Sequence, residues 1–219
     1  MHVVRIVAKR SAPARTSRRA SSGGSPRLGA KQAWPSCGYC GESMSLYLQF
    51  DVPARFGLVF APGSHFLLFN CARCDAIPEA PPRSRLPASW LKADRAQSYR
   101  AILNLPQTRE RALPSDRSVR EQSIVFEAVQ DRLTEGLDGP VGRRDFKVGG
   151  APAWVQPPQY LRCACGAQMG FLLQVPSSTV PRWKSRSGAS LPFCADLDAF
   201  VFACSAQCNP YATAIIAQR

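Results

Sequence analysis

Apolar and polar residues alternate along several short segments of the chain, and this alternation predicts β-strands. Within residues 45–52, Leu46, Leu48 and Phe50 recur with a period of two, which is typical of a strand with one buried face. Shorter apolar runs beside turn residues predict further strands over residues 3–7, 56–60, 65–70, 99–105, 171–175, 199–203 and 211–216. The pattern therefore predicts a mostly β protein.

A different period appears in the middle of the chain. The residues that recur there at spacings of three and four are Val119, Gln122, Phe126, Val129 and Leu133. This spacing predicts one main helix over residues 118–134, with a serine as its N-cap and Gly136 just beyond its end.

One order of features occurs twice: a Gly-Gly turn, a tryptophan, a Cys-Gly pair, an alternating apolar strand and a second cysteine pair. When Cys40 is aligned with Cys165, Gln49 falls on Gln174 without a gap. We therefore expect an α+β, mostly β fold with internally duplicated antiparallel-sheet modules, zinc-ribbon-like cysteine clusters and one main helix between them. The expected organisation is a basic disordered arm (1–22), a first β/cysteine module (23–75), a connecting segment with the helix (76–145) and a second β/cysteine module (146–219).

Length and composition fit a globular protein. At 219 residues and 45% hydrophobic content, the chain can form one domain or two fused halves. No apolar run approaches the roughly 18 residues that cross a bilayer, and the N-terminus lacks the long apolar stretch of a signal peptide. Nine cysteines without a secretory signal favour a reducing compartment, so we expect a cytoplasmic protein without membrane contact.

The net charge of +13 is concentrated near the N-terminus. Residues 1–32 contain eight lysines and arginines and no acidic residue. Such a segment is typical of a disordered tail, but its composition also fits a nucleic-acid contact or an organellar transit peptide, and the sequence leaves all three open.

Two cysteine pairs with metal-ligand spacing bracket the strands of the first module. They are Cys37 and Cys40, followed by a glycine, and Cys71 and Cys74. Two such pairs are typical of a zinc ribbon, in which four thiolates surround the metal, so we expect a structural Zn²⁺ here.

The second set of cysteines has less regular spacing. One residue separates Cys163 from Cys165, and three separate Cys204 from Cys208, while Arg162 falls on the position of Cys37. These four are expected to bind a second Zn²⁺ or to have lost it, so the chain would hold one or two ions. The ninth cysteine, Cys194, is interpreted as a buried apolar residue or a substitute ligand.

The candidates for an active site are few, and no enzymatic activity is expected. The chain has two histidines, His2 and His65, which do not suffice for a Ser-His-Asp arrangement with supporting groups. Gln49, Gln174 and Trp154 are candidates for partner binding, although each glutamine could instead satisfy backbone groups in the sheet. Arg182, Trp183, Lys184 and Arg186 form a candidate nucleic-acid loop, or an ordinary charged loop.

Together these motifs resemble a known family. The match rests on GGAPAW at residues 149–154, CG at 165–166, MGFLLQ at 169–174 and VFAC at 201–204, with a weaker first copy at 23–74. The pattern resembles the YwqG-like family and its eukaryotic relatives around programmed cell death protein two. The resemblance implies a β-rich duplicated fold without known enzymatic activity; the eukaryotic relatives are chaperones of a small-subunit ribosomal protein, and bacterial members are suggested immunity or RNA-associated proteins.

The sequence thus predicts a non-enzymatic, zinc-stabilised protein-binding module, chaperone-like or of the immunity type. The alternative is an RNA-binding or ribosome-associated factor that uses the basic arm and the loop at 182–186. A metal-dependent hydrolase is a third hypothesis, but it needs a histidine or carboxylate ligand that the sequence does not offer near the cysteines.

Overall fold

The structure is a computed structural model that describes residues 2–9, 19–54, 57–74, 78, 81, 84–115, 119, 121–136, 139–177, 193–194 and 197–219, with the backbone alone for 2–9 and 139–140. Its strands are β1 (His2–Lys9), β2 (Ser21–Ser22), β3 (Arg27–Gly29), β4 (Ser45–Asp51), β5 (His65–Asn70), β6 (Tyr99–Asn104), β7 (Glu110–Ala112), β8 (Gln122–Gln130), β9 (Thr134–Gly136), β10 (Gly139–Val141), β11 (Lys147–Val148), β12 (Met169–Val175), β13 (Asp198–Cys204) and β14 (Thr213–Gln218). A short 3-10 helix, η2 (Ala88–Leu91), precedes β6.

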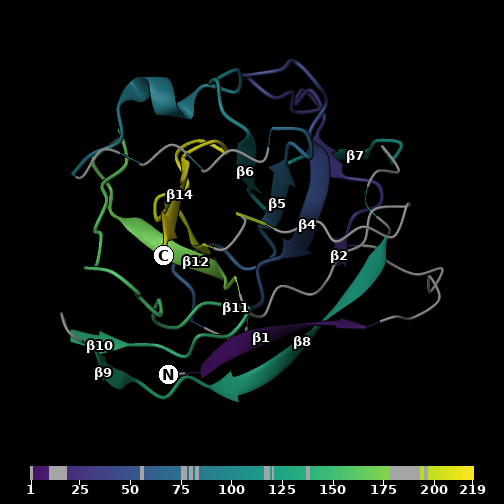
Figure 1. Cartoon of the computed structure of the whole chain (residues 1–219). Helices are drawn as coiled ribbons and strands as arrows, with labels where there is room; N and C mark the ends of the chain where they lie inside the picture. Colours follow the sequence, from purple (N-terminus) through teal and green to yellow (C-terminus); the bar gives the residue numbers. More distant parts are fainter. Residues whose placement is uncertain are drawn as a thin grey trace.

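In the described part of the chain, ten strands form one sheet in the order β14-β13-β12-β11-β1-β8-β2-β4-β5-β6. Its strand pairs are antiparallel, and β3–β7 and β9–β10 form two small additional ribbons. The long β1–β8 pair runs along one side of the molecule, with the other strands of the two modules above it (Figure 1). The prediction of a mostly β fold with antiparallel sheets is confirmed.

The predicted helix over residues 118–134 is wrong. Residues 122–130 form β8, which pairs with all eight residues of β1. The same segment also alternates with a period of two, because Ile124 and Phe126 both pack against the core while Val125 lies between them. The segment forms a strand and not a helix because it pairs with β1, which lies more than one hundred residues away in the sequence.

Most predicted strands are confirmed, including those in β1, β4, β5, β6, β12, β13 and β14. Residues 57–60 of the strand expected at 56–60 form no strand, and residue 56 lies outside the described residues. The expected disordered arm also differs from the structure, because β1 and β2 both lie within residues 1–22 and both join the large sheet. Residues 10–18 of that arm lie outside the described residues.

The duplication extends to the strands at the centre of the sheet. In the structure the two modules are longer than the expected 23–75 and 146–219: the first comprises β1 to β6 and the second β8 to β14. Their first strands, β1 and β8, pair with each other. Each then pairs with the second strand of the opposite module, β1 with β11 and β8 with β2. The sheet order therefore reads the same from both ends, and the modules are related by a pseudo-twofold rotation about the β1–β8 pair.

The register of the strands confirms this relation residue by residue. Gln49 of β4 lies opposite Ser21 of β2, and Gln174 of β12 lies opposite Lys147 of β11. Both β4 and β12 carry a register shift at the same place, between Leu46 and Leu48 in one and at the aligned residues of the other. Such a β-bulge turns successive apolar residues toward different sides of the strand.

Among the described residues, the buried apolar side chains form three clusters. The central core combines both modules, with Phe50 and Phe66 from the first and Leu173 and Val201 from the second. Each module also has a smaller core on the opposite face of its strands. Each smaller core contains two buried cysteines. The cysteine groups are therefore anchored in apolar packing at the ends of the strands.

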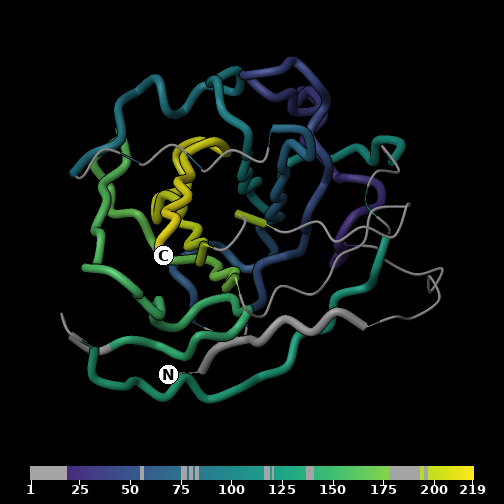
Figure 2. The backbone as a smooth tube through the Cα atoms, in the orientation of Figure 1, coloured from purple at the N-terminus to yellow at the C-terminus, as the bar shows by residue number. Residues whose placement is uncertain are grey.

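The two edge strands of the sheet approach each other on the far side of the central core. The backbone N–H of Leu103, in β6, donates to the carbonyl of Pro210 at 2.9 Å, and the Oγ of Thr213, in β14, donates to the carbonyl of Ala101 at 2.9 Å. Figure 2 shows the yellow C-terminal segment beside the blue-to-teal strands of the first module. The sheet thus almost closes on itself, and we call this line of approach the seam.

Candidate functional site

The first candidate site is a group of four cysteines at one end of β4 and β5. The Sγ atoms of Cys37 and Cys74 lie 3.7 Å apart, those of Cys40 and Cys71 lie 3.6 Å apart, and all four lie within 4.8 Å of one another. Disulfide sulfurs would lie about 2.05 Å apart, so these are free thiols. Four sulfurs placed tetrahedrally around a metal at about 2.3 Å would be about 3.8 Å apart, which closely matches the observed spacing.

Backbone hydrogen bonds hold the first cysteine pair in a tight turn. The N–H of Gly41 donates to the carbonyl of Cys37 at 2.9 Å, and Gly41 has a φ of 73°, which favours glycine. Burial raises the pKa of the Cys37 thiol, but the backbone N–H groups of Cys40 and Tyr39 donate to its sulfur and lower the pKa to about 7. The turn therefore stabilises the thiolate that a metal requires.

The second pair of the first group follows β5 directly. Cys71 comes immediately after the last residue of that strand, and the N–H of Cys74 donates to the Cys71 sulfur at 3.4 Å. The hydrogen bond to the Cys40 thiol raises the pKa of Cys74 to about 12. Without a metal the group therefore retains protons, which a bound dication would displace.

The second candidate site repeats this arrangement at the end of β12 and β13. The Sγ atoms of Cys163 and Cys208 lie 3.6 Å apart, as do those of Cys165 and Cys204, and all four lie within 4.8 Å of one another. The backbone N–H of Ala167 donates to the Cys165 sulfur and lowers the pKa of that thiol to about 7. Both sequence-predicted groups are thus brought together, and either could hold a metal ion.

The irregular spacing of the second group is explained by two compensating changes. Cys163, not Arg162, takes the place of Cys37, because its carbonyl accepts the N–H of Gly166 at 2.9 Å as the carbonyl of Cys37 accepts that of Gly41. The turn from Cys163 to Gly166 is one residue shorter than its counterpart in the first module. The loop from Cys204 to Cys208 is one residue longer than its counterpart. Gln207 accommodates the additional residue with a φ of 44°.

Among the described residues, the side chains that form these two groups are all cysteines. Four thiolates complete the tetrahedral coordination of Zn²⁺ and leave no position for water, which is the composition of a structural site. Cys194 belongs to neither group and packs in the central core, as its interpretation as a buried apolar residue predicts.

The two aligned glutamines have a structural role. Gln49 and Gln174 are completely buried, so neither can contact a partner, and this correction removes them from the candidate binding residues. The Oε1 of Gln49 accepts the N–H of Arg27 at 3.1 Å, and that of Gln174 accepts the N–H of Ala153 at 2.8 Å. Each glutamine therefore fixes the matching segment of its module to the sheet.

Trp154 differs from its counterpart in the first module. The repeated order of features aligns Trp154 with Trp34, but the hydrogen bonds of the two glutamines align it with Leu28, which follows Arg27 and is completely buried in β3. Trp34 itself is half-buried and meets Phe69 edge to face at 6.0 Å. The Trp154 ring stacks on Phe202 at 5.8 Å with an interplanar angle of 11°, but it remains half-buried. It lines a surface hollow of about 560 Å³.

Three arginines line the same hollow: Arg132, Arg143 and Arg144. Arg143 pairs with Asp145 at 2.8 Å, and Arg144 pairs with the buried Asp198 at 2.6 Å. Arg144 and Arg143 keep about half of their side chains exposed, at 51% and 42%. The hollow thus combines an aromatic ring with exposed guanidinium groups, and we call it the Trp154 hollow.

A buried ion pair supports the wall of the Trp154 hollow. Lys147 and Asp131 are both fully buried, and the Lys147 Nζ lies 3.0 Å from each carboxylate oxygen. The carboxylate also accepts the backbone N–H groups of Arg143 and Ala151, each at 2.9 Å. The pair therefore fixes the loop that presents Arg143 against the turn that leads to Trp154.

A second charged network, in the first module, was not found from the sequence. Arg19 bridges Asp51 and Glu110, and His65 lies completely buried with its Nδ1 2.8 Å from Asp51. Burial raises the pKa of Asp51, but the hydrogen bonds from His65 and Arg19 outweigh it and bring the pKa below 3.8. His65 thus belongs to a buried network and to neither cysteine group.

The remaining sequence candidates are not placed. Arg182, Trp183, Lys184 and Arg186 lie outside the described residues. The arginines of the Trp154 hollow were missed, although two of them form a basic pair just before the second Gly-Gly turn.

Within the part of the chain that the structure describes, no helix has the length and apolar character needed to cross a membrane. A scan against protein-family models finds no match for this chain, and a search of curated proteins also finds none, so the family resemblance stays a prediction.

Proposed function

We propose that the chain is a non-enzymatic protein-binding module in which two structural Zn²⁺ ions hold the strand ends and the Trp154 hollow receives the partner. The proposed zinc sites follow from the two groups of four thiols at tetrahedral spacing. Their likeness in geometry, despite different spacing in the sequence, supports a requirement for both. The metal would thus stabilise the fold, and binding would occur elsewhere.

The observation that carries the binding proposal is the position of Trp154 beside the arginines of the hollow. Trp154 is half-buried and borders a hollow large enough for several side chains. Tryptophan and arginine are the residues that most often dominate binding energy at protein interfaces. The three arginines favour a partner segment with acidic residues.

The resemblance to the YwqG-like and programmed cell death protein two-like family supports the same class of function. Its eukaryotic relatives are chaperones of a ribosomal protein, and its bacterial members are suggested immunity or RNA-associated proteins, which corresponds to a chaperone-like or immunity-type role here. The proposal assigns no catalytic residue.

A peptide selection tests the proposal. The zinc-loaded protein is presented with a random library of short peptides, and the binding of enriched sequences is measured by fluorescence polarisation. We expect acidic sequences, and we expect Trp154→Ala to weaken their binding roughly 30-fold or more, as for an interface residue worth about 2 kcal/mol. Tyr160→Ala is the matched control, because Tyr160 is 73% exposed and does not line the hollow. If nothing is enriched, or if both variants bind alike, the Trp154 hollow is not the binding site.

A second candidate function is RNA binding at the same hollow. The observation that favours it is the set of three arginines around an aromatic ring in a chain of net charge +13. RNA binding would weaken steeply as salt rises, because each phosphate contact releases counterions, whereas peptide binding through Trp154 would depend on salt much less. Titration of a fluorescent single-stranded RNA at several salt concentrations separates the two.

A further inference from the structure

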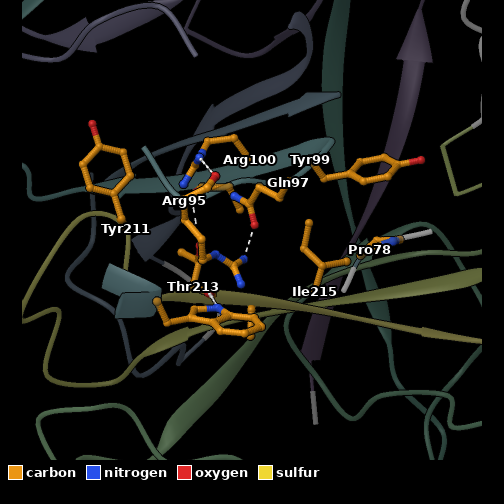
Figure 3. Close-up of a pocket in the computed structure, with 11 residues that line it drawn as sticks. Pro78, Arg95, Gln97, Tyr99, Arg100, Tyr211, Thr213 and Ile215 are labelled. Atoms are coloured by element: carbon orange, nitrogen blue, oxygen red, sulfur yellow. Dashed lines mark hydrogen bonds between the residues drawn. The ribbon is translucent and has the colours of Figure 1, made fainter. Parts of the chain in front are cut away.

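A small cavity lies in the seam, between β6 and β14. It has a volume of about 20 Å³ and is lined by residues of β6 and β14 and by Arg95 (Figure 3), and also by Trp90 of η2. The Arg95 guanidinium lies over the Trp90 ring, 3.4 Å from its centre. The cavity is therefore bounded by backbone, an aromatic ring and a positive charge.

A second and more deeply buried guanidinium, that of Arg100, lines the same cavity. Arg100 is 3% exposed. Its two terminal nitrogens donate to the carbonyls of Lys92 at 3.2 Å and Arg95 at 2.7 Å, and its Nε has no hydrogen-bond partner. In the described part of the chain, no carboxylate forms an ion pair with it. Burial lowers the pKa of Arg100, while Tyr211 and the exposed Asp94 act in the opposite direction.

A buried charge without a counter-ion is costly, and the fold itself does not require one at this position. Arg100 lies opposite Phe69 in β5, two residues before Cys71; in the second module the residue opposite Phe202, two before Cys204, is Ala214. The pseudo-twofold therefore places alanine where the first module has arginine. Arginine at this position is therefore not a requirement of the strand pairing that the two modules share.

We propose that Arg100 is a binding site for a compact monovalent anion, either a halide or a single carboxylate group, held in the seam by the Nε–H and the positive charge. The size of the cavity supports this class of ligand, because about 20 Å³ accommodates little more than one water-sized group. Phosphate and sulfate are too large. The site is separate from the Trp154 hollow, so the proposal is independent of the proposed function.

Anomalous scattering locates such an ion directly. Crystals of the full-length protein are soaked in sodium bromide, and we expect a bromide peak beside the Arg100 Nε in the wild type and none in Arg100→Gln. A water molecule in that position, or no peak there, would overturn the proposal. This measurement needs the wild type alone, so it decides the question even if the variant fails to fold.

A solution measurement completes the test and compares two sources of the anion. The midpoint of thermal unfolding is followed in chloride and in formate at constant ionic strength, with a large organic sulfonate as the balancing anion. We expect a saturable rise in the wild type that Arg100→Gln lacks, because a ligand that binds only the folded state stabilises it. Arg111→Gln is the matched control, since Arg111 also donates to a backbone carbonyl, that of Gln32, but is exposed. An equal rise in the wild type and Arg100→Gln would show a general salt effect and contradict the site.

Discussion

The loop between β13 and β14 connects the second cysteine group to the opposite module. It contains Cys208, and it contacts the first module through three hydrogen bonds. The Oε1 of Gln207 accepts the N–H of Ala61 at 2.8 Å, its Nε2 donates to the Oγ of Ser64 at 2.8 Å, and the carbonyl of Pro210 accepts the N–H of Leu103 at 2.9 Å. A metal bound to this group would therefore hold the two modules together at a distance from its own ligands.

Cys165→Ser is the perturbation that tests this connection, because it removes one ligand without changing the β13–β14 loop. If the three hydrogen bonds contribute about 1 kcal/mol each, their loss lowers the free energy of local opening by about 3 kcal/mol. The amide exchange rates of Ala61 and Leu103 should then rise roughly 150-fold. Hydrogen exchange followed by NMR on the zinc-loaded protein measures both amides in one experiment.

Cys40→Ser is the control for this prediction. It disrupts the first group in the same way. Among the described residues, that group makes no hydrogen bond to the β13–β14 loop, which reaches its apolar core through Tyr211 alone, so Ala61 and Leu103 should exchange close to the wild-type rate. Unchanged exchange in Cys165→Ser, with the metal shown to be lost, would refute the reasoning: the loop would then be held by its hydrogen bonds alone.

Three further predictions concern metal, charge and pH. Mass spectrometry of inorganic elements should find two zinc ions per chain, and Cys40→Ser and Cys165→Ser should each lose one; a chain that binds none when folded and reduced would contradict both sites. Lys147→Met should destabilise the fold by about 3–5 kcal/mol in urea unfolding, because it leaves the Asp131 carboxylate buried without its counter-ion; a cost below about 1 kcal/mol would mean that backbone donors suffice. The pKa of Asp51 is lower in the folded than in the unfolded chain, so its contribution to stability should be present above pH 3.8 and decline as the pH falls further. In acid unfolding, Asp51→Asn should show less of this decline.

Local patterns in the sequence were sufficient for most of the longer strands, although not for β8, and for the first cysteine group. The alternation in β4 identified a strand, although both of its faces are buried and not one as the alternation predicted, because Ser45, Tyr47 and Gln49 are also buried. The first cysteine pair lies on one short turn. Such features depend on neighbours a few residues apart. The confirmed predictions are of this kind.

The errors have a different physical origin, since each depends on contacts between distant segments. β8 was assigned as a helix because its partner β1 lies at the other end of the chain. Cys163 was misaligned because a deletion in one turn is compensated by an insertion in a loop forty residues later. The Trp154 hollow was missed because the buried pair of Lys147 and Asp131, which supports its wall, is not indicated by any local pattern in the sequence.

The exchange of first strands between the modules is the arrangement of a symmetric homodimer whose two subunits have been joined into one chain. In a homodimer every residue occurs twice, so any change near the two-fold axis alters both sides at once. Fusion removes that constraint, and each half can then vary while the other preserves the fold. Three functional or buried charged residues differ between the halves. Leu28 stands where the second half has Trp154, Ala214 where the first half has Arg100, and Ser21 where the second half has Lys147. In this chain the differences between two copies of one fold are where individual sites arise.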